Sequence, residues 1–277
     1  MRESGYITAD QGQVFWSASG DGPAVLLIHG GSIDSRMWDG QVAFLEKDYR
    51  VITYDFRGLG KSTRPTAAYR MSDDALAVLD HLGVASAAVV GFSIGTFIAL
   101  DLAVRAPERV AALAISAVLP WNEDVPEEFA AARATLGALL EPRTEAQRRG
   151  DLAASVAIDL DVWASAHESE ARAALTEMCM RAPYFHEYRE SDDEWYGQWP
   201  ALADAELAAF ASPSLVIVGD RDTEIVQLAS ERLAGILPNA ELRVVPGADH
   251  FVSLGRPAEF NEACGALLER RRADGTW

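Results

Sequence analysis

The chain has 277 residues and a formal net charge of −18, which repels phosphate backbones and anionic lipid surfaces and so argues against nucleic acid or membranes as partners. Hydrophobic residues make up 49% and charged residues 24%, as in ordinary soluble globular proteins, and no apolar run reaches the roughly 20 residues that span a bilayer. The first ten residues contain no basic segment that leads into an apolar one, so we expect neither a secretory signal nor a lipid anchor and predict a cytoplasmic protein.

Two segments near the start of the chain alternate apolar and polar residues around Gln11-Gly12, as the strands of an edge β-hairpin do. They cover residues 6–9 and 13–18. Four later runs are continuously apolar, which is typical of strands buried on both faces of a parallel sheet. They cover residues 24–28, 51–54, 87–90 and 110–116. The pattern predicts a hairpin followed by a mostly parallel sheet.

Helical stretches separate these apolar runs. Ser72 is placed to cap a helix with an acidic first turn, and Gly83 is placed to end it. A second helix is expected from Ser93 to about Arg105, because Pro107 lacks the amide that would continue it. The alternation of strands and helices predicts right-handed crossovers that cover both faces of the sheet.

The pattern changes from about Leu119 to Ser212, where helical stretches rich in Ala, Glu and Arg contain no strand-like run. Two strands and two helices then follow. The strands are expected at 214–219 and 242–245, and the helices at 225–237 and 257–272. The sequence therefore predicts an α/β fold with a helical cap inserted after the sixth strand. We expect the core at residues 1–118 and 213–277, and the cap at 119–212.

The strongest local signal is Gly91-Phe92-Ser93-Ile94-Gly95, which directly follows a predicted strand and directly precedes a predicted helix. This is the G-x-S-x-G arrangement of a nucleophile elbow, in which a sharp turn exposes the serine hydroxyl. Glycines two residues on either side relieve crowding around such a turn. Ser93 is the candidate nucleophile, and the alternative is that its side chain only caps the helix.

A second glycine-rich loop, His29-Gly30-Gly31-Ser32, follows the predicted strand at 24–28. Together with the elbow, it resembles the α/β-hydrolase family, and in particular the esterase, enol-lactonase and cofactor-free haloperoxidase branches. The resemblance implies that the backbone amides of Gly31 and Ile94 form an oxyanion hole. It also implies that His29 is structural and is not a catalytic base.

Two further segments support the resemblance. The family's D-x-R-G-x-G-x-S loop is similar to Asp55-Phe56-Arg57-Gly58-Leu59-Gly60-Lys61-Ser62, and Met37-Trp38 follows shortly after His29. Asp55 and Arg57 are expected to hold their loop through ion pairing and backbone bonds, rather than to transfer protons.

The acid and the base of such a site follow the nucleophile in the chain. His250 lies in Pro246-Gly247-Ala248-Asp249-His250-Phe251, which resembles the family's histidine loop. Two carboxylates, Asp220 and Asp222, lie on a turn that resembles the family's G-x-x-D turn, and we predict Asp222, because the family's acid is the third residue past Gly219. The alternative for Asp222 is that it caps the next helix. The three remaining histidines are expected to have structural roles. They are His81, His167 and His186.

The predicted reaction is hydrolysis of a small carboxylic ester or lactone through an acyl-enzyme on Ser93, with no metal or organic cofactor. The two cysteines, Cys179 and Cys264, show no ligand spacing, so neither a zinc site nor a disulfide scaffold is expected. Three reactions of the same fold remain open, namely those of a thioesterase, a carbon-carbon bond hydrolase and an iminopeptidase. A low-turnover ligand receptor or signalling protein that keeps the triad is also open.

The predicted cap is rich in aromatic residues, which could line an apolar pocket or pack the cap on the core. Four of them are the candidate substrate-binding residues. They are Trp121, Tyr184, Phe185 and Trp199. The expected partner is a small-molecule ester or lactone, and the protein is expected to be a monomer or a homodimer.

Overall fold

The computed structural model describes residues 2–9, 12–121, 126–167, 169–190, 197–198, 201–275 and 277. Its main sheet has eight strands in the order β1-β2-β4-β3-β6-β7-β9-β10. The strand bounds are β1 Glu3–Ala9, β2 Gly12–Ser19, β3 Ala24–Ile28, β4 Arg50–Tyr54, β6 Ala87–Phe92, β7 Val110–Ser116, β9 Ser214–Gly219 and β10 Ala240–Val245. Strand β2 pairs antiparallel with β1 and β4, and the pairs from β4 to β10 are parallel. The hairpin and the mostly parallel sheet predicted from the sequence are confirmed.

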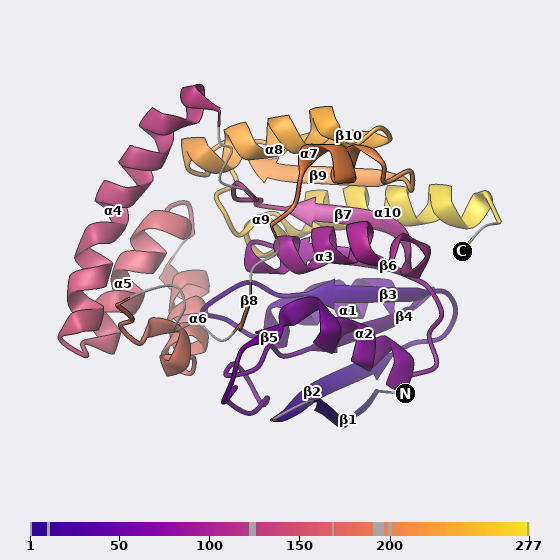
Figure 1. Ribbon diagram of the computed structural model, residues 1–277, viewed down its shortest axis with the longest axis horizontal. Coiled ribbons are helices and arrows are strands. Elements are labelled where there is room, and N and C mark those ends of the chain that lie inside the picture. Colours follow the sequence, from indigo (N-terminus) through magenta and orange to yellow (C-terminus); the bar gives the residue numbers. More distant parts are fainter. Residues whose placement is uncertain are drawn as a thin grey trace.

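Helices cover both faces of this sheet (Figure 1). Helix α1 contacts α10, α2 contacts α3, and α8 packs on β9 and β10. The bounds are α1 Asp39–Leu45, α2 Met71–His81, α3 Ile94–Arg105, α8 Glu224–Ile236, α9 Val252–Gly255 and α10 Pro257–Ala273. Short 3₁₀ helices lie at η1 Ser35–Trp38 and η2 Pro107–Arg109. Helix α3 therefore ends before Pro107, as its missing amide requires.

One predicted helix cap is wrong. Helix α2 begins at Met71 after Arg70, so Ser72 lies inside the first turn. Its hydroxyl donates to the Asp101 carboxylate on α3 instead of capping backbone amides. The other end is as predicted, because Gly83 has a φ of 67°, the left-handed conformation in which glycine commonly ends a helix.

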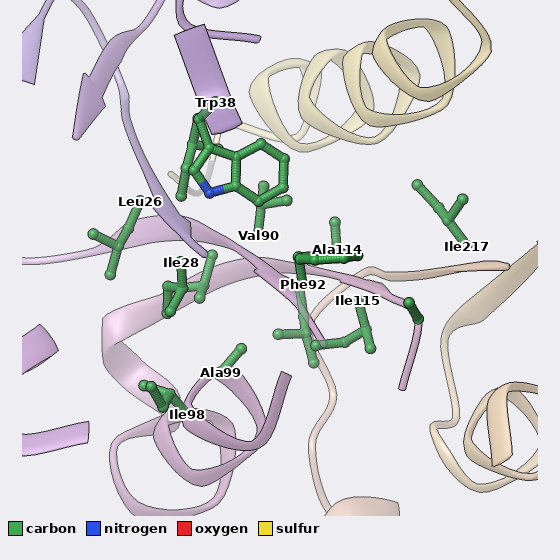
Figure 2. Close-up of a cluster of buried hydrophobic side chains, with 14 of the residues drawn as sticks. Leu26, Ile28, Trp38, Val90, Phe92, Ile98, Ala99, Ala114, Ile115 and Ile217 are labelled. Atoms are coloured by element: carbon green, nitrogen blue, oxygen red, sulfur yellow. The ribbon is translucent and has the colours of Figure 1, made fainter. Parts of the chain in front are cut away.

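The interior of the sheet is apolar on both sides of the strands that carry the site. All residues of β3, β6, β7 and β9 are buried. Figure 2 shows Ile98 and Ala99 of α3 on one side of these strands and Trp38 on the other. Trp38 packs against Phe260 of α10, with ring centroids 5.9 Å apart. Packing on both faces fixes the strand ends from which the site loops leave.

A helical insertion separates β7 from β9, the sixth and seventh strands of the main sheet in chain order. Its elements are η3 Glu127–Phe129, α4 Ala130–Arg148, α5 Leu152–Trp163, α6 Ser169–Met180, η4 Pro183–His186, β8 Gly197–Gln198 and α7 Asp204–Ala208. Helices α4, α5 and α6 form a group beyond one end of the sheet, at the left of Figure 1. Strand β8 is a departure from the expected all-helical insertion. It pairs parallel with a second two-residue strand, β5 Tyr69–Arg70.

Candidate active site

Ser93 stands on the sharp turn between β6 and α3. Its backbone has φ 51° and ψ −118°, a left-handed conformation that is rare and strained for a residue with a side chain. Its amide donates to the carbonyl of Ser116 at 2.9 Å, which ties the turn to the end of β7. Its side chain makes no capping hydrogen bond to α3, so the alternative reading of Ser93 as a side-chain cap does not hold.

The two flanking glycines allow this turn to approach the neighbouring backbone. A Cβ atom on Gly91 would lie 2.6 Å from the carbonyl oxygen of Gly95, and one on Gly95 would collide with the carbonyl oxygens of Ile28 and His29. Any side chain at either position would push α3 away from β3 or distort the elbow. The G-x-S-x-G spacing therefore has a direct steric cause.

A continuous hydrogen-bond chain joins the three side chains predicted to carry the chemistry. His250 Nε2 lies 3.0 Å from Ser93 Oγ, and His250 Nδ1 lies 2.9 Å from Asp222 Oδ2. The Asp222 and His250 side chains are 1% and 5% exposed. Asp222 Oδ1 also accepts from the amide of Thr223 at 2.7 Å, which fixes the carboxylate. The imidazole thus bridges a hydroxyl and a buried carboxylate through opposite ring nitrogens.

The neighbouring carboxylate makes a different contact. Asp220 Oδ1 accepts from the amide of Gly247 at 2.6 Å and so holds the loop that contains His250. Helix α8 begins at Glu224 after Thr223, and the Asp222 carboxylate accepts from Thr223 at the helix entrance while its other oxygen faces His250. The structure brings Asp222, and not Asp220, to the imidazole.

A second group of serine, histidine and aspartate lies inside the insertion but is connected differently. Ser155 Oγ is 2.9 Å from His186 Nδ1, and Asp159 Oδ2 is 3.7 Å from the same nitrogen. The other nitrogen, Nε2, is buried and has no hydrogen-bond partner among the described residues. Burial lowers the pKa of His186 despite the charge of Asp159. Because both partners meet one nitrogen, this imidazole cannot relay a proton from serine to carboxylate.

The His29 loop is held by the ring of His29 itself. His29 is fully buried, its Nε2 accepts from the amide of Phe56 at 3.0 Å, and its Nδ1 lies 2.7 Å from the carbonyl of Gly30. Burial lowers the pKa of this imidazole, which favours the neutral form that these two bonds require. With both nitrogens bonded to backbone, His29 positions the glycine loop that follows it.

The loop at residues 55–62 is held in a similar way. Asp55 accepts from the amides of Ser35 at 3.0 Å and Lys61 at 2.8 Å. Arg57 forms a buried ion pair with Asp74, with Nη2 2.6 Å from Oδ1. These contacts join the loop to η1 and α2.

Comparison with known proteins agrees with this geometry. The family model described as the alpha/beta hydrolase fold matches residues 23–257. The chain belongs to this family. It is 27% identical to 3-oxoadipate enol-lactonase 2 of Acinetobacter baylyi over 258 residues, which are 90% of each protein. It is 26% identical to the carboxylesterase YbfK of Bacillus subtilis over 275 residues, which are 96% of this chain and 88% of that protein.

A solved structure described as Est816, an N-acyl homoserine lactone degrading enzyme, superposes with a TM-score of 0.72 at 27% identity. The match covers 95% of this chain and 99% of that one. The relatives of this alpha/beta hydrolase therefore include enzymes named for lactones and for carboxylic esters.

Two of the four candidate substrate-binding residues lie against glycines of the site loops. A Cβ atom on Gly31 would collide with the Phe185 ring and would lie 2.6 Å from the Ile94 side chain, so Phe185 lies beside both predicted oxyanion residues. The Tyr184 ring packs on Gly58, with the guanidinium groups of Arg64 and Arg189 each 4.7 Å from its centroid.

The other two candidates differ. Trp121 is buried, donates from Nε1 to Asp204 at 3.1 Å and lies under the guanidinium of Arg232, which is 4.9 Å from its ring. These contacts join the start of the insertion to α7 and α8. Trp199 lies outside the residues that the structure describes. A role in substrate binding stays a prediction for all four.

Three side chains that the sequence did not assign to the site lie beside His250 or the loop that carries it. The ring of Trp163, at the end of α5, is 4.5 Å from the imidazole centroid. Asp249 and His167 bond to each other at 2.9 Å directly beside the base. The aromatic content of the insertion was a signal for Trp163, whereas nothing in the local sequence indicated the Asp249–His167 contact.

A metal site and a membrane-spanning helix each require a particular arrangement of residues. Within the described ranges, no group of three or more His, Cys, Asp or Glu side chains is arranged to hold a metal ion. Burial raises the pKa of the Cys179 and Cys264 thiols to about 12, as expected for packed interior cysteines. In the part of the chain that the structure describes, no helix has the length and apolar character to cross a membrane.

Proposed function

We propose that the protein is a serine hydrolase that cleaves a small carboxylic ester or lactone through an acyl-enzyme on Ser93. The observation that carries the proposal is the contact of His250 with Ser93 Oγ on one ring nitrogen and with Asp222 on the other. This connection provides a proton acceptor at the hydroxyl and a buried negative charge behind it.

In the first step, Ser93 Oγ attacks the substrate carbonyl carbon while His250 Nε2 takes the hydroxyl proton. Asp222 holds Nδ1–H and stabilises the imidazolium that results. The new oxyanion is expected to lie near the amides of Gly31 and Ile94, which belong to the two loops that meet beside Ser93. Preorganised amides at that point stabilise charge that exists only in the transition state.

In the second step, the C–O bond to the leaving alcohol breaks and His250 returns the proton to the alkoxide oxygen. Water then attacks the acyl-enzyme carbonyl as His250 takes its proton, and collapse of this intermediate releases the acid and restores Ser93. In a lactone the leaving alcohol and the acid are parts of one molecule, so the product is a hydroxy acid, or its keto form where the lactone is an enol ester.

Two observations support the ester or lactone class. The relatives named above include an enol-lactonase, a carboxylesterase and a lactone-degrading enzyme. The side chains that reach the site from the insertion, Phe185 and Trp163, are aromatic, which suits a substrate with an apolar body and one polar reacting group.

The test is covalent labelling followed by turnover. Wild-type protein and Ser93→Ala are treated with a fluorophosphonate, and intact mass is measured. We expect one adduct on the wild type and none on the variant. Turnover is then measured on graded p-nitrophenyl esters, aliphatic lactones, a thioester and an aminoacyl arylamide.

Ser93→Ala is expected to lower turnover of the preferred substrate by about 10⁴-fold or more, because the lost hydroxyl acts only in the reaction. Its melting temperature should stay close to that of the wild type. Residual activity above about one hundredth would remove Ser93 as the nucleophile. Labelling without turnover of any substrate would instead favour a ligand receptor.

A further inference from the structure

The loop that carries His250 is held on one side by the turn that follows β9. The amide of Arg221 donates to the carbonyl of Ala248 at 2.9 Å, and the amide of Gly247 donates to Asp220 at 2.6 Å. These bonds hold the first half of the loop beside the turn that contains Asp222. They leave the half that contains Asp249 and Phe251 to be held by other contacts.

Asp249 fastens that second half to the insertion. Its Oδ2 accepts from the amide of Ala166 at 2.8 Å and from His167 Nδ1 at 2.9 Å, and its Oδ1 accepts from the amide of Phe251 at 3.1 Å. Ala166 and His167 follow α5, more than 80 residues away in the sequence. One carboxylate therefore joins the base's own loop to the cap.

The charge of this carboxylate is consistent with its bonds. Burial by itself raises the pKa of Asp249, but the bonds from His167, Ala166 and Phe251 outweigh burial and hold the pKa below its usual value. The group is therefore ionised near neutral pH and accepts all three bonds, so His167 donates from Nδ1. The His167 and Asp249 side chains are 3% and 2% exposed.

The same cap segment reaches the base directly. Trp163 lies three residues before Ala166, and its ring is 4.5 Å from the His250 imidazole. The His167 ring meets the Phe251 ring edge to face at 6.0 Å. The insertion thus contacts the imidazole through Trp163 and contacts the loop that carries the imidazole through Asp249.

We propose that Asp249 is a positioning residue, through which the docked cap segment at 164–167 fixes the orientation of His250 toward Ser93. This inference rests on the proposed function, because it gives Asp249 its effect through the base. This role differs from that of Asp222. Asp222 contacts the imidazole, whereas Asp249 acts on the backbone of the loop that carries the imidazole. The consequence is that the base is fully aligned only when the cap is docked.

Three variants test this role. Asp249→Asn turns an amide NH₂ toward at least one of the three N–H groups that donate to the carboxylate, so at least one of these bonds is lost without a large change in volume. His167→Ala removes one donor. His167→Asn keeps an amide N–H close to the position of Nδ1–H and should restore much of what His167→Ala loses.

The matched control is Glu187→Gln. Glu187 also joins insertion to core, through Arg64 at 2.7 and 2.5 Å, but it is exposed. All variants are compared with wild type by kcat and KM on p-nitrophenyl acetate, by melting temperature, and by the far-downfield proton resonance of His250 Nδ1–H in the NMR spectrum.

We expect Asp249→Asn to lower kcat by about 10- to 100-fold with KM changed less than about threefold, since small misplacement of a catalytic group costs rate more than binding. The His250 resonance should shift or broaden. His167→Ala should show the same pattern more weakly, His167→Asn should approach wild type, and Glu187→Gln should leave kcat and the resonance unchanged.

Asp249→Asn and His167→Ala could lower the melting temperature but leave kcat and the His250 resonance unchanged. The contact would then contribute to stability alone, and the proposal would be overturned. Equal losses in His167→Ala and His167→Asn would also overturn it. If the wild type turns over no ester, the proposed function fails, while the resonance still reports whether Asp249 orients His250.

Discussion

The sheet and the insertion reach the candidate site through different kinds of contact. On the sheet side, Ser93, Asp222 and His250 stand on loops that leave strand ends, and backbone or carboxylate hydrogen bonds hold these loops together. On the insertion side, Phe185 and Trp163 reach the site with aromatic rings that contact glycine or imidazole surfaces, whereas the hydrogen bonds of Ala166 and His167 go to Asp249 in the loop of the base. Directional bonds permit one arrangement, whereas ring contacts tolerate substitution. From this difference we expect the reaction to depend mainly on the loops of the sheet, and substrate choice to depend mainly on the insertion.

The largest expected effect on activity that tests this division is at Asp222, which shares a turn with Asp220. In Asp222→Asn, the amide oxygen stays with the Thr223 N–H and the NH₂ group faces His250 Nδ1. This stabilises the tautomer whose Nε2 already carries a proton and cannot accept the one from Ser93. We expect kcat/KM to fall by about 10³- to 10⁴-fold.

Asp220→Asn is the matched control, since its carboxylate bonds the amide of Gly247 and not the imidazole. The amide oxygen of Asn can keep that bond, so the expected loss is less than about tenfold. Comparable losses in the two variants, measured as kcat/KM on one ester, would show that the turn acts as a unit and that Asp222 has no separate role.

A smaller effect is expected from the insertion side. Phe185→Ala opens space beside Gly31 and Ile94, so the preference between long and short acyl esters should shift by about tenfold toward long ones. Turnover of a small ester such as an acetate should change less. Tyr188→Ala provides the control, because Tyr188 is an exposed aromatic of the same region. Identical relative rates across a graded acyl series in both variants would contradict a role for Phe185 in selectivity.

The smallest expected effect is on the pH dependence of the free energy of unfolding. It arises from one buried histidine in the core and one in the insertion. Burial lowers the pKa of His29 in the core and of His186 in the insertion. The unfolded chain therefore takes up protons below about pH 6.5 that the folded chain does not, and the free energy of unfolding decreases as pH falls through that range.

His186→Asn should keep a bond to Ser155 while removing one of these titrating groups. We expect the pH dependence of the unfolding free energy between pH 7.5 and 5.5 to decrease by less than about 1.4 kcal/mol per pH unit, the limit for one proton. Urea unfolding at several pH values measures it, with His81→Asn as the exposed control. An unchanged slope would mean that His186 binds protons equally in the folded and the unfolded chain, so that burial does not lower its pKa.

The sequence was most informative where function depends on local backbone. The elbow at Ser93 and the turn at Asp222 follow apolar strands, and their glycines are required by close backbone approach, so the motif and the geometry have one cause. The sequence did not predict contacts that depend on how the insertion docks. The Asp249–His167 bond and the Trp163–His250 contact join residues more than 80 positions apart, and no periodicity or spacing relates them. The incorrect prediction that Ser72 caps helix α2 has a similar origin, because its hydroxyl donates to Asp101 on another helix.

The pairing of β7 with β9 has a consequence for how this fold tolerates change. Leu113 and Ser214 are parallel neighbours in the sheet, although the whole insertion lies between them. The entropy lost in closing such a loop grows only with the logarithm of its length, so doubling the loop would cost about 0.6 kcal/mol. The insertion can therefore lengthen, shorten or exchange helices with little effect on the strand pairing beneath it. We therefore expect changes in the insertion to alter substrate choice while the strands of the sheet keep their pairing.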